Sequence, residues 1–283
     1  MIEVPFIVGK IHSGLNNNMK KNILITSAAS AAIIAGITLL IINSAKKKTG
    51  CSGICAGCSG CGKKLPSPAY YVQKEKTLKK ELSKKEDIFK PALRKYYQDA
   101  EIQQIITETN AQFNLLIPAI PYIGGDENPR TEDIENAAMV LAFYKVQKEH
   151  GKTTNEIGRM IDDSIKHELQ RYPGWLLHMT GSRFFSKKYK KTEKENAIKS
   201  QKRMYPYDWV TDYIEGDKKT FDYGCNHYEC GIYKYLTANQ AHDLVPYLCK
   251  LDYLYSDAFG EVLVRTSTIA ENGTICDFRF TRK

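Results

Sequence analysis

ENGTICDFRF, residues 271–280, closes the chain with the pattern that decides the fold. Asn272-Gly273 is typical of a two-residue type I′ turn, because both residue types tolerate the left-handed backbone that this turn requires. The residues after the turn alternate between apolar and polar side chains, as a strand with one buried face does. The stretch therefore predicts a β-hairpin at the C-terminal end of the chain.

The position of the turn also predicts which residues of this hairpin face each other. Ile269 pairs with Cys276, and Thr268 pairs with Asp277. Neighbours in a strand point to opposite faces, so Cys276 and Asp277 are expected to serve two different features. The face that looks like core carries Cys276, Phe278 and Phe280, and the face that is solvent or a polar pocket carries Thr266, Thr268, Asp277 and Arg279.

The residues upstream of the sheet show helical periodicity. A charged helical pattern covers residues 72–114 and is interrupted near Pro91. Two further helices are predicted, with Thr131 and Thr154 as N-caps and Gly151 at the end of the first. Their apolar stripes are Ile134, Ala138, Leu141 and Tyr144, and Ile157, Ile161, Ile165 and Leu169. We expect an α+β fold, with a helical N-terminal half packed on a small antiparallel sheet.

The positive charge of the chain is concentrated in one stretch. The 283 residues carry a formal net charge of +9. Residues 46–95 alone contain 14 lysines and arginines against 4 acidic residues, so the remainder is nearly neutral. Such a stretch beside an apolar segment fits contact with anionic lipid better than recognition of nucleic acid, which we do not expect as a partner.

Residues 22–45 contain no charged residue and are long enough to span a bilayer. Lysines follow the run more densely than they precede it, which favours a single-pass membrane protein with its main domain in the cytoplasm. The alternative is a cleaved signal peptide, although the apolar run is longer than usual for one. The predicted division is an N-terminal tail 1–21, a transmembrane helix 22–45, a basic cysteine-rich linker 46–74 and a folded domain 75–283.

The linker contains four cysteines at a spacing that suits a metal. Cys51, Cys55, Cys58 and Cys61 are separated by small or apolar residues, five of which are glycine or serine. Four thiolates in a loop of this kind can converge on zinc or on an iron–sulfur cluster. A flexible tether with reduced or lipidated thiols is the alternative, and an exported chain would form disulfides instead.

Further cysteines lie among acids and aromatic residues in the C-terminal half. In an extended FDYGCNHYEC, Cys225 and His227 share one face with Glu229, and Cys230 lies on the other. In AHDLVPYLCKLDYLYSDAFG, Cys249 and Asp252 are three apart and would be neighbours on a helix.

These blocks resemble the L-2-amino-thiazoline-4-carboxylic acid hydrolase family. The resemblance rests on Glu229-Cys230-Gly231-Ile232-Tyr233-Lys234, Pro246-Tyr247-Leu248-Cys249-Lys250-Leu251-Asp252, Arg265-Thr266-Ser267-Thr268-Ile269-Ala270 and Cys276-Asp277-Phe278-Arg279-Phe280. It covers roughly residues 75–283, and the apolar segment and the cysteine-rich linker are not part of the family pattern. The resemblance implies hydrolysis of a cyclic amidine: water adds at the carbon between ring nitrogen and sulfur, the carbon–sulfur bond opens, and N-carbamoyl-cysteine forms.

Such a reaction needs a nucleophile, a proton donor for the departing sulfur and a cation for the substrate carboxylate. The resemblance makes Cys230, Cys249 and Cys276 the candidate nucleophiles. Asp252 or His227 would be the acid or base, with Asp277 a further candidate, and Arg265, Arg279 and Thr268 would bind the substrate.

The alternative function is a small-molecule-binding or redox-sensing domain without catalysis. The C-terminal tail is faintly similar to domains of the vinyl-4-reductase type, in which cysteines near a similar hairpin bind zinc. In that case Cys230, Cys249 and Cys276, with His227 or Asp252, would form a structural zinc site. Either function implies a small-molecule ligand, and the sequence leaves the oligomeric state open.

Overall fold

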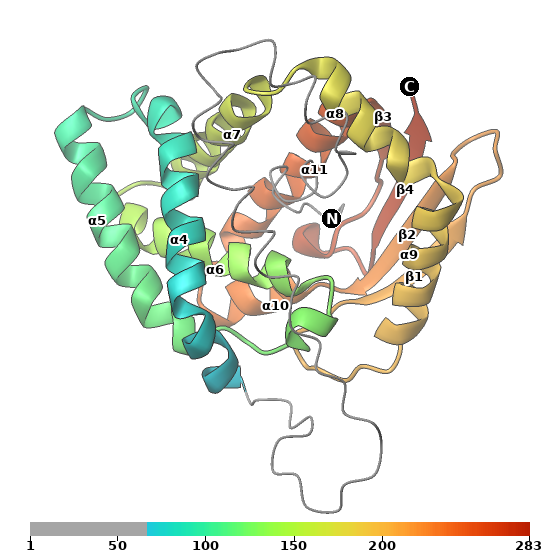
Figure 1. The fold of residues 1–283 in the computed structure, drawn as a ribbon, viewed down its shortest axis with the longest axis horizontal. Coiled ribbons are helices and arrows are strands. Elements are labelled where there is room, and N and C mark those ends of the chain that lie inside the picture. The colour runs from blue at the N-terminus through green and yellow to red at the C-terminus, as the bar shows by residue number, and fades with distance from the viewer. Residues whose placement is uncertain (1–66) are drawn as a thin grey trace, which may run out of the picture. The chain divides into compact units, whose positions relative to one another are not determined.

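The computed structural model describes residues 67–283, in which helices come first and strands come late (Figure 1). The α-helices are α4 Ser67–Leu93, α5 Asp99–Leu116, α6 Thr131–Glu149, α7 Thr154–Gln170, α8 Gly174–Gly181, α9 Lys187–Ser200, α10 Gly231–Ala238 and α11 Val245–Phe259. The strands are β1 Val210–Glu215, β2 Tyr223–Glu229, β3 Glu261–Val264 and β4 Cys276–Arg282. Single 3₁₀ turns lie at Ile117–Ala119, Gly125–Glu127, Ser182–Phe185, His242–Leu244 and Ile269–Glu271.

The first helix begins earlier than the sequence analysis predicts. It starts at Ser67 within the predicted linker, and the side chain of Tyr71 is fully buried. Tyr71 also donates a hydrogen bond to the carbonyl of Pro121, so this turn is part of the fold. Pro91 lies in the last turn of α4, where the interruption was predicted.

The caps of α6 and α7 differ by one residue from the prediction. The N-cap of α6 is Arg130, and Thr131 instead donates from its hydroxyl to the carbonyl of Gly125. The N-cap of α7 is Thr153, which forms a capping box with Glu156 and so satisfies two free backbone N–H groups. Both predicted apolar stripes face the interior, and every residue in them except the partly buried Ile161 is buried.

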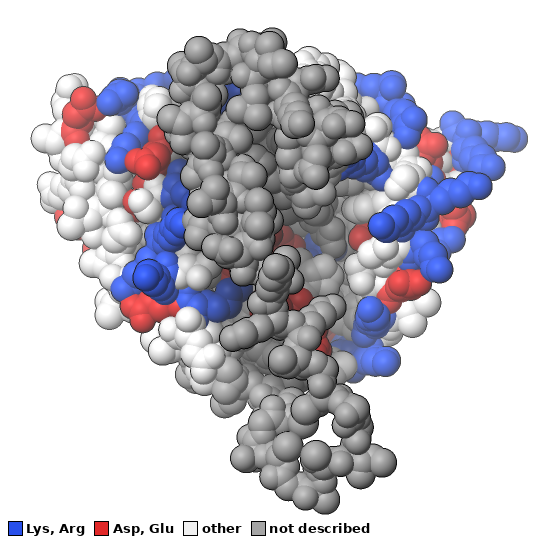
Figure 2. Space-filling model, viewed as in Figure 1, with Lys and Arg blue, Asp and Glu red and all other residues white. Residues whose placement is uncertain are grey.

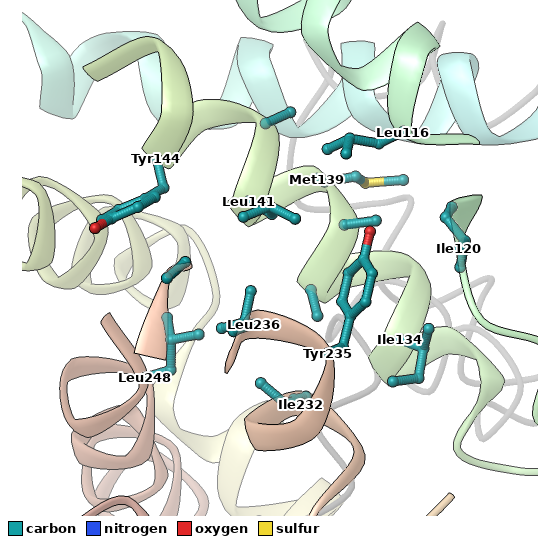
Figure 3. Packing of buried hydrophobic residues seen from close by; sticks show 14 of the residues in the cluster. Leu116, Ile120, Ile134, Met139, Leu141, Tyr144, Ile232, Tyr235, Leu236 and Leu248 are labelled. Atoms are coloured by element: carbon teal, nitrogen blue, oxygen red, sulfur yellow. The ribbon is translucent and has the colours of Figure 1, made fainter. Parts of the chain in front are cut away.

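The main core lies between α6, α10 and α11 (Figure 3). Ile134 and Leu141 of α6 face Tyr235 and Leu236 of α10, and Leu248 of α11 closes the cluster. These side chains are at most 8% exposed. Burying a side chain of this kind contributes about 1.5–3 kcal/mol, so this packing fixes α10 and α11 against the helical half.

The four strands form one antiparallel sheet with the order β1-β2-β4-β3. His227 lies opposite Cys276, and Cys225 lies opposite Phe278. The predicted α+β fold, with a helical half and a small antiparallel sheet at the C-terminal end, is confirmed.

The predicted two-residue hairpin turn is wrong. Leu263 pairs with Phe280 and Val264 with Arg279, a register two residues away from the predicted one. The connection is an eleven-residue loop, 265–275, that holds the 3₁₀ turn Ile269–Glu271, and Asn272 has φ 66 as the residue after that turn. A shift of two preserves the faces, so the predicted separation of Cys276 from Asp277 remains correct.

The two faces of the sheet have different surroundings. The inner face carries Cys225, His227, Cys276, Phe278 and Phe280, and the helical side of the molecule covers it. Aromatic contacts tie it to the helices, including Tyr189 of α9 against Tyr223 of β2. The outer face carries Asn226, Asp277 and Arg279.

Lysine and arginine side chains are seen on both flanks of the face in Figure 2, over α4 and over α9. Part of this charge serves packing, because Lys190 lies over the ring of Tyr223 and Lys194 over the ring of Tyr213. Within residues 67–283, no helix combines the length and apolar character that would let it cross a bilayer. The predicted span 22–45 lies outside these residues.

Candidate active site

A buried ion pair connects α11 to the loop after β3. Arg265 Nη1 donates to Asp252 Oδ2 at 2.7 Å, and both side chains are at most 3% exposed. Arg265 Nη2 donates to the carbonyl of Cys249 at 2.8 Å, and the guanidinium lies 4.9 Å from the ring of Phe278. The predicted neighbourhood of Cys249 and Asp252 on one helix is confirmed, and Arg265 joins them to the inner face of the sheet.

The three cysteines of the family motifs are buried, and the sulfurs of two of them accept hydrogen bonds from the backbone. The backbone N–H of Tyr233 donates to Cys230 Sγ at 3.4 Å, and that of Ile269 donates to Cys276 Sγ at 3.2 Å. Burial raises the pKa of Cys230 to about 11. Burial, followed by the charge of Asp252, raises the pKa of Cys249 even further. Cys230 and Cys249 are therefore neutral thiols near pH 7, whereas attack requires a thiolate.

His227 lies at the centre of the inner face. The atoms Thr211 Oγ1 and His227 Nδ1 are 2.7 Å apart, and the imidazole meets the ring of Phe278 edge-on with 5.1 Å between centroids. Burial lowers the pKa of His227 well below its usual value, and the positive charges of Arg130 and Arg265 lower it further. The ring is thus neutral at physiological pH, and a neutral imidazole can accept a proton.

Cys225 also belongs to this cluster, although the sequence analysis gave it no role. Its Sγ lies 3.6 Å from His227 Nε2, and its side chain is only partly buried. The signal was visible in the sequence, since Cys225 and His227 were predicted to share a face of one strand. Sequence alone could not rank this pair above the cysteines that carry the family motifs.

Asp277 does not face this cluster. On the outer side of β4, it accepts hydrogen bonds from Thr266 N at 2.9 Å, Thr266 Oγ1 at 2.6 Å and Ser267 N at 2.6 Å. Partial burial opposes ionisation, but these bonds outweigh it and lower the pKa of Asp277. We interpret Asp277 as a clamp on the loop that carries Arg265.

Thr268 and Arg279, both predicted to bind substrate, also make structural contacts. Thr268 is buried and donates to Glu271 in the turn of the same loop. Arg279 lies across β2 on the outer face and donates to Asn226 Oδ1 at 2.9 Å. Gly224 leaves space for this crossing, because a Cβ there would come within 2.9 Å of the Arg279 side chain. Arg265 and Arg279 therefore lie on different sides of the sheet.

The alternative zinc site is not formed by the described residues. Within 67–283, no group of three or more histidine, cysteine, aspartate or glutamate side chains is arranged to hold a metal ion. Cys230 and Cys276 instead accept hydrogen bonds from the backbone N–H groups of Tyr233 and Ile269. Cys51, Cys55, Cys58 and Cys61 lie outside the described residues, so zinc or an iron–sulfur cluster there stays a prediction.

The fold and the site define an α+β domain with a neutral histidine, a partly exposed thiol and a buried arginine on one face of its sheet. The family model of the L-2-amino-thiazoline-4-carboxylic acid hydrolases matches residues 132–280, which run from the first turn of α6 into β4. The chain belongs to this family, as its motifs predicted. It matches no curated protein and no solved structure.

Proposed function

We propose that this chain hydrolyses a small cyclic amidine that carries a carboxylate, of the L-2-amino-thiazoline-4-carboxylate type. The family supports hydrolysis. The observation that carries the proposal is His227, a neutral imidazole. Its Nδ1 atom contacts the hydroxyl of Thr211, and the positive charges of Arg130 and Arg265 act on the ring. A group that can accept and return a proton and a cationic group for the carboxylate are two of the requirements for hydrolysing an anionic substrate of this kind.

The reaction consumes one water. Oxygen bonds to the amidine carbon, the ring carbon–sulfur bond breaks, and the departing sulfur becomes the thiol of N-carbamoyl-cysteine. His227 would take a proton during the attack and return it to the sulfur, so one imidazole serves as base and then as acid. Burial favours the proton-free ring that starts this cycle.

The arginines would attract the substrate carboxylate. Arg265 is held by Asp252 and by the carbonyl of Cys249, which fix its planar fork on the inner side of the sheet. Arg130 is the N-cap of α6, and its guanidinium lies over Trp209 at 5.3 Å from the ring. Both arginines act on His227 electrostatically, so a carboxylate beside the imidazole would lie in a positive field.

The experiment uses the full-length chain purified in mild detergent. It is incubated with L-2-amino-thiazoline-4-carboxylate while free thiol is measured and N-carbamoyl-cysteine is identified by mass spectrometry. We expect thiol release from the wild type and a fall of roughly 10²–10⁴-fold in His227→Gln, the range for loss of a general base. The Asp277→Asn variant serves as a control on the opposite face of the sheet.

Two comparisons test the substrate class. The D-enantiomer and 2-aminothiazoline without the carboxylate should both react much more slowly than the L-acid. Equal rates for all three compounds would refute the role of the arginines, and no product from any of them in a folded sample would refute the proposed hydrolysis.

We also propose that residues 22–45 anchor the chain in a membrane, because this apolar run carries no charge and lysines flank it. The full-length chain should then remain with membranes after carbonate extraction, and a chain without residues 1–45 should not. Release of the full-length chain by carbonate would contradict the anchor.

A further inference from the structure

Cys225 and His227 form a thiol–imidazole pair on the inner face of the sheet. They are two residues apart in β2, so their side chains point to the same side. Cys225 Sγ and His227 Nε2 are 3.6 Å apart, within the reach of a hydrogen bond to sulfur. Of the four cysteines in residues 67–283, the other three are buried, and Cys225 is the one whose sulfur lies within hydrogen-bond distance of an imidazole.

Thr211 of β1 contacts the imidazole of this pair on its other nitrogen. It lies opposite His227 in the β1–β2 register, and its hydroxyl contacts His227 Nδ1 at 2.7 Å. The backbone of Thr211 is itself bonded to Ser200, whose hydroxyl accepts from Thr211 N at 2.9 Å. The end of α9 therefore supports Thr211, and Thr211 orients the ring.

We propose that Cys225 is the nucleophile of this site, with His227 as its base and Thr211 as the residue that positions the imidazole. This inference rests on the proposed hydrolase function. It requires the tautomer in which His227 Nδ1–H donates to Thr211 Oγ1, because Nε2 is then free to accept the proton of Cys225. A nucleophile, a base and a group that orients the base are the arrangement used in covalent hydrolysis by thiol enzymes.

Each step balances. Cys225 Sγ bonds to the amidine carbon while its proton passes to His227 Nε2. The ring carbon–sulfur bond breaks, and the departing sulfur takes that proton. The whole substrate is then joined to Cys225 as an isothiourea with a free thiol. Water adds at the same carbon, and the Cys225 carbon–sulfur bond breaks. Cys225 regains a proton through His227, and N-carbamoyl-cysteine leaves without any change of oxidation state.

Burial keeps the thiol of Cys225 neutral at rest, because it raises the pKa of this group to about 11. Because the resting thiol is neutral, it is activated by proton transfer to His227 as the bond forms, rather than by a standing ion pair.

The first experiment traps the intermediate. The full-length chain is mixed with L-2-amino-thiazoline-4-carboxylate and quenched with acid, and its peptides are mapped by mass spectrometry. We expect an adduct with the mass of the intact substrate on the Cys225 peptide. Cys225→Ser and Cys225→Ala should lack it and lose thiol release by roughly 10³-fold or more. Release that persists in both variants overturns the inference while the hydrolase function stands. An adduct on Cys249 instead overturns it as well.

The second experiment does not depend on turnover. Chloroacetamidine alkylates thiols and carries the amidine group, so its rate at each cysteine can be followed by peptide mapping. Cys225 should react faster than Cys230, Cys249 and Cys276, and His227→Gln should abolish this advantage. If the wild type shows it but hydrolyses no substrate, the nucleophile is supported and the proposed substrate is not. Equal rates in wild type and His227→Gln overturn the inference.

Thr211 needs a test that separates positioning from folding. Thr211→Val removes the hydroxyl and preserves the shape, whereas Thr211→Ser restores the hydroxyl. We expect Thr211→Val to slow both hydrolysis and alkylation of Cys225, and Thr211→Ser to recover most of each rate at unchanged Tm. Full activity in Thr211→Val would overturn the positioning role.

Discussion

The two faces of the C-terminal sheet hold their polar groups in different ways. On the outer face, Asp277 accepts three hydrogen bonds from the loop, and Arg279 is bonded across β2. On the inner face, the carboxylate of Glu261 has no hydrogen-bond partner among the described residues, although it is 1% exposed. His227 is neutral there because burial disfavours its charge.

This difference between the two faces indicates which one stabilises the fold and which one could carry out catalysis. A carboxylate that is fully hydrogen-bonded is stabilised in its charged form and is poorly suited to move a proton. A buried ionisable group with few hydrogen-bond partners lowers the stability of the fold, but it remains able to bind or transfer a proton. The outer face therefore holds the loop in place, and the inner face is the better candidate for catalysis.

The largest expected effect on stability comes from the buried pair on the inner side. Arg265→Met leaves Asp252 without its cation in a site that excludes water. Losing one partner of a buried ion pair costs ~3–5 kcal/mol, so urea unfolding should show this loss. The double variant Arg265→Met, Asp252→Leu should recover much of it. A single variant as stable as the wild type would contradict the importance of this pair.

Glu261 offers a smaller effect of opposite sign. Burial raises its pKa to about 8 in the folded state, above the ordinary value of 4.5. The folded chain therefore retains a proton that the unfolded chain releases, and this contribution to stability is lost as the pH rises from about 4.5 to about 8. Glu261→Gln should be more stable than the wild type at pH 8, by at most about 4 kcal/mol, when both are unfolded in urea.

The matched measurement for Glu261 is the same unfolding at pH 5. The wild-type side chain is protonated in the folded state there, so the gain from Glu261→Gln should shrink. A gain that is equal at both pH values would mean that burial of the charge is not its cause.

The next largest effect on stability is expected at Asp277, which holds the loop on the outer face of the sheet. Asp277→Ala removes the acceptor of three hydrogen bonds and should cost ~1–3 kcal/mol of stability. Because Asp277 faces away from His227, kcat below the melting temperature should stay close to that of the wild type. A large fall in kcat at unchanged Tm would show that Asp277 acts in the reaction, as the family motif first suggested.

The sequence predicted those parts of the molecule that depend on local periodicity. The stripes of α6 and α7 and the alternation of β4 follow from which face is buried, so they were correct. The turn was not, because Asn272 adopts its positive φ after a 3₁₀ turn rather than within a type I′ turn. A dipeptide that tolerates left-handed backbone does not specify which kind of turn uses it.

The site was harder to predict, because its members meet through tertiary packing. Cys249 and Asp252 could be paired by helical spacing, but their contact with Arg265 depends on the course of the loop 265–275. Thr211 gave no signal at all, since only the β1–β2 register brings it to His227. The family motifs contain Cys230, Cys249 and Cys276, which are buried, and do not include Cys225, so the sequence analysis did not select Cys225.

The smallest expected effect tests the neutral state of His227 through stability. Its folded-state pKa lies below the ordinary value, so the unfolded chain binds a proton more readily below about pH 6.5. Stability should therefore fall as the pH drops below that value, with a slope of at most about 1.4 kcal/mol per pH unit for one proton. His227→Gln should remove this part of the slope between pH 6.5 and 5. A slope that is unchanged in His227→Gln would mean that the folded chain binds the His227 proton as readily as the unfolded chain does, so burial would not be what keeps this imidazole neutral.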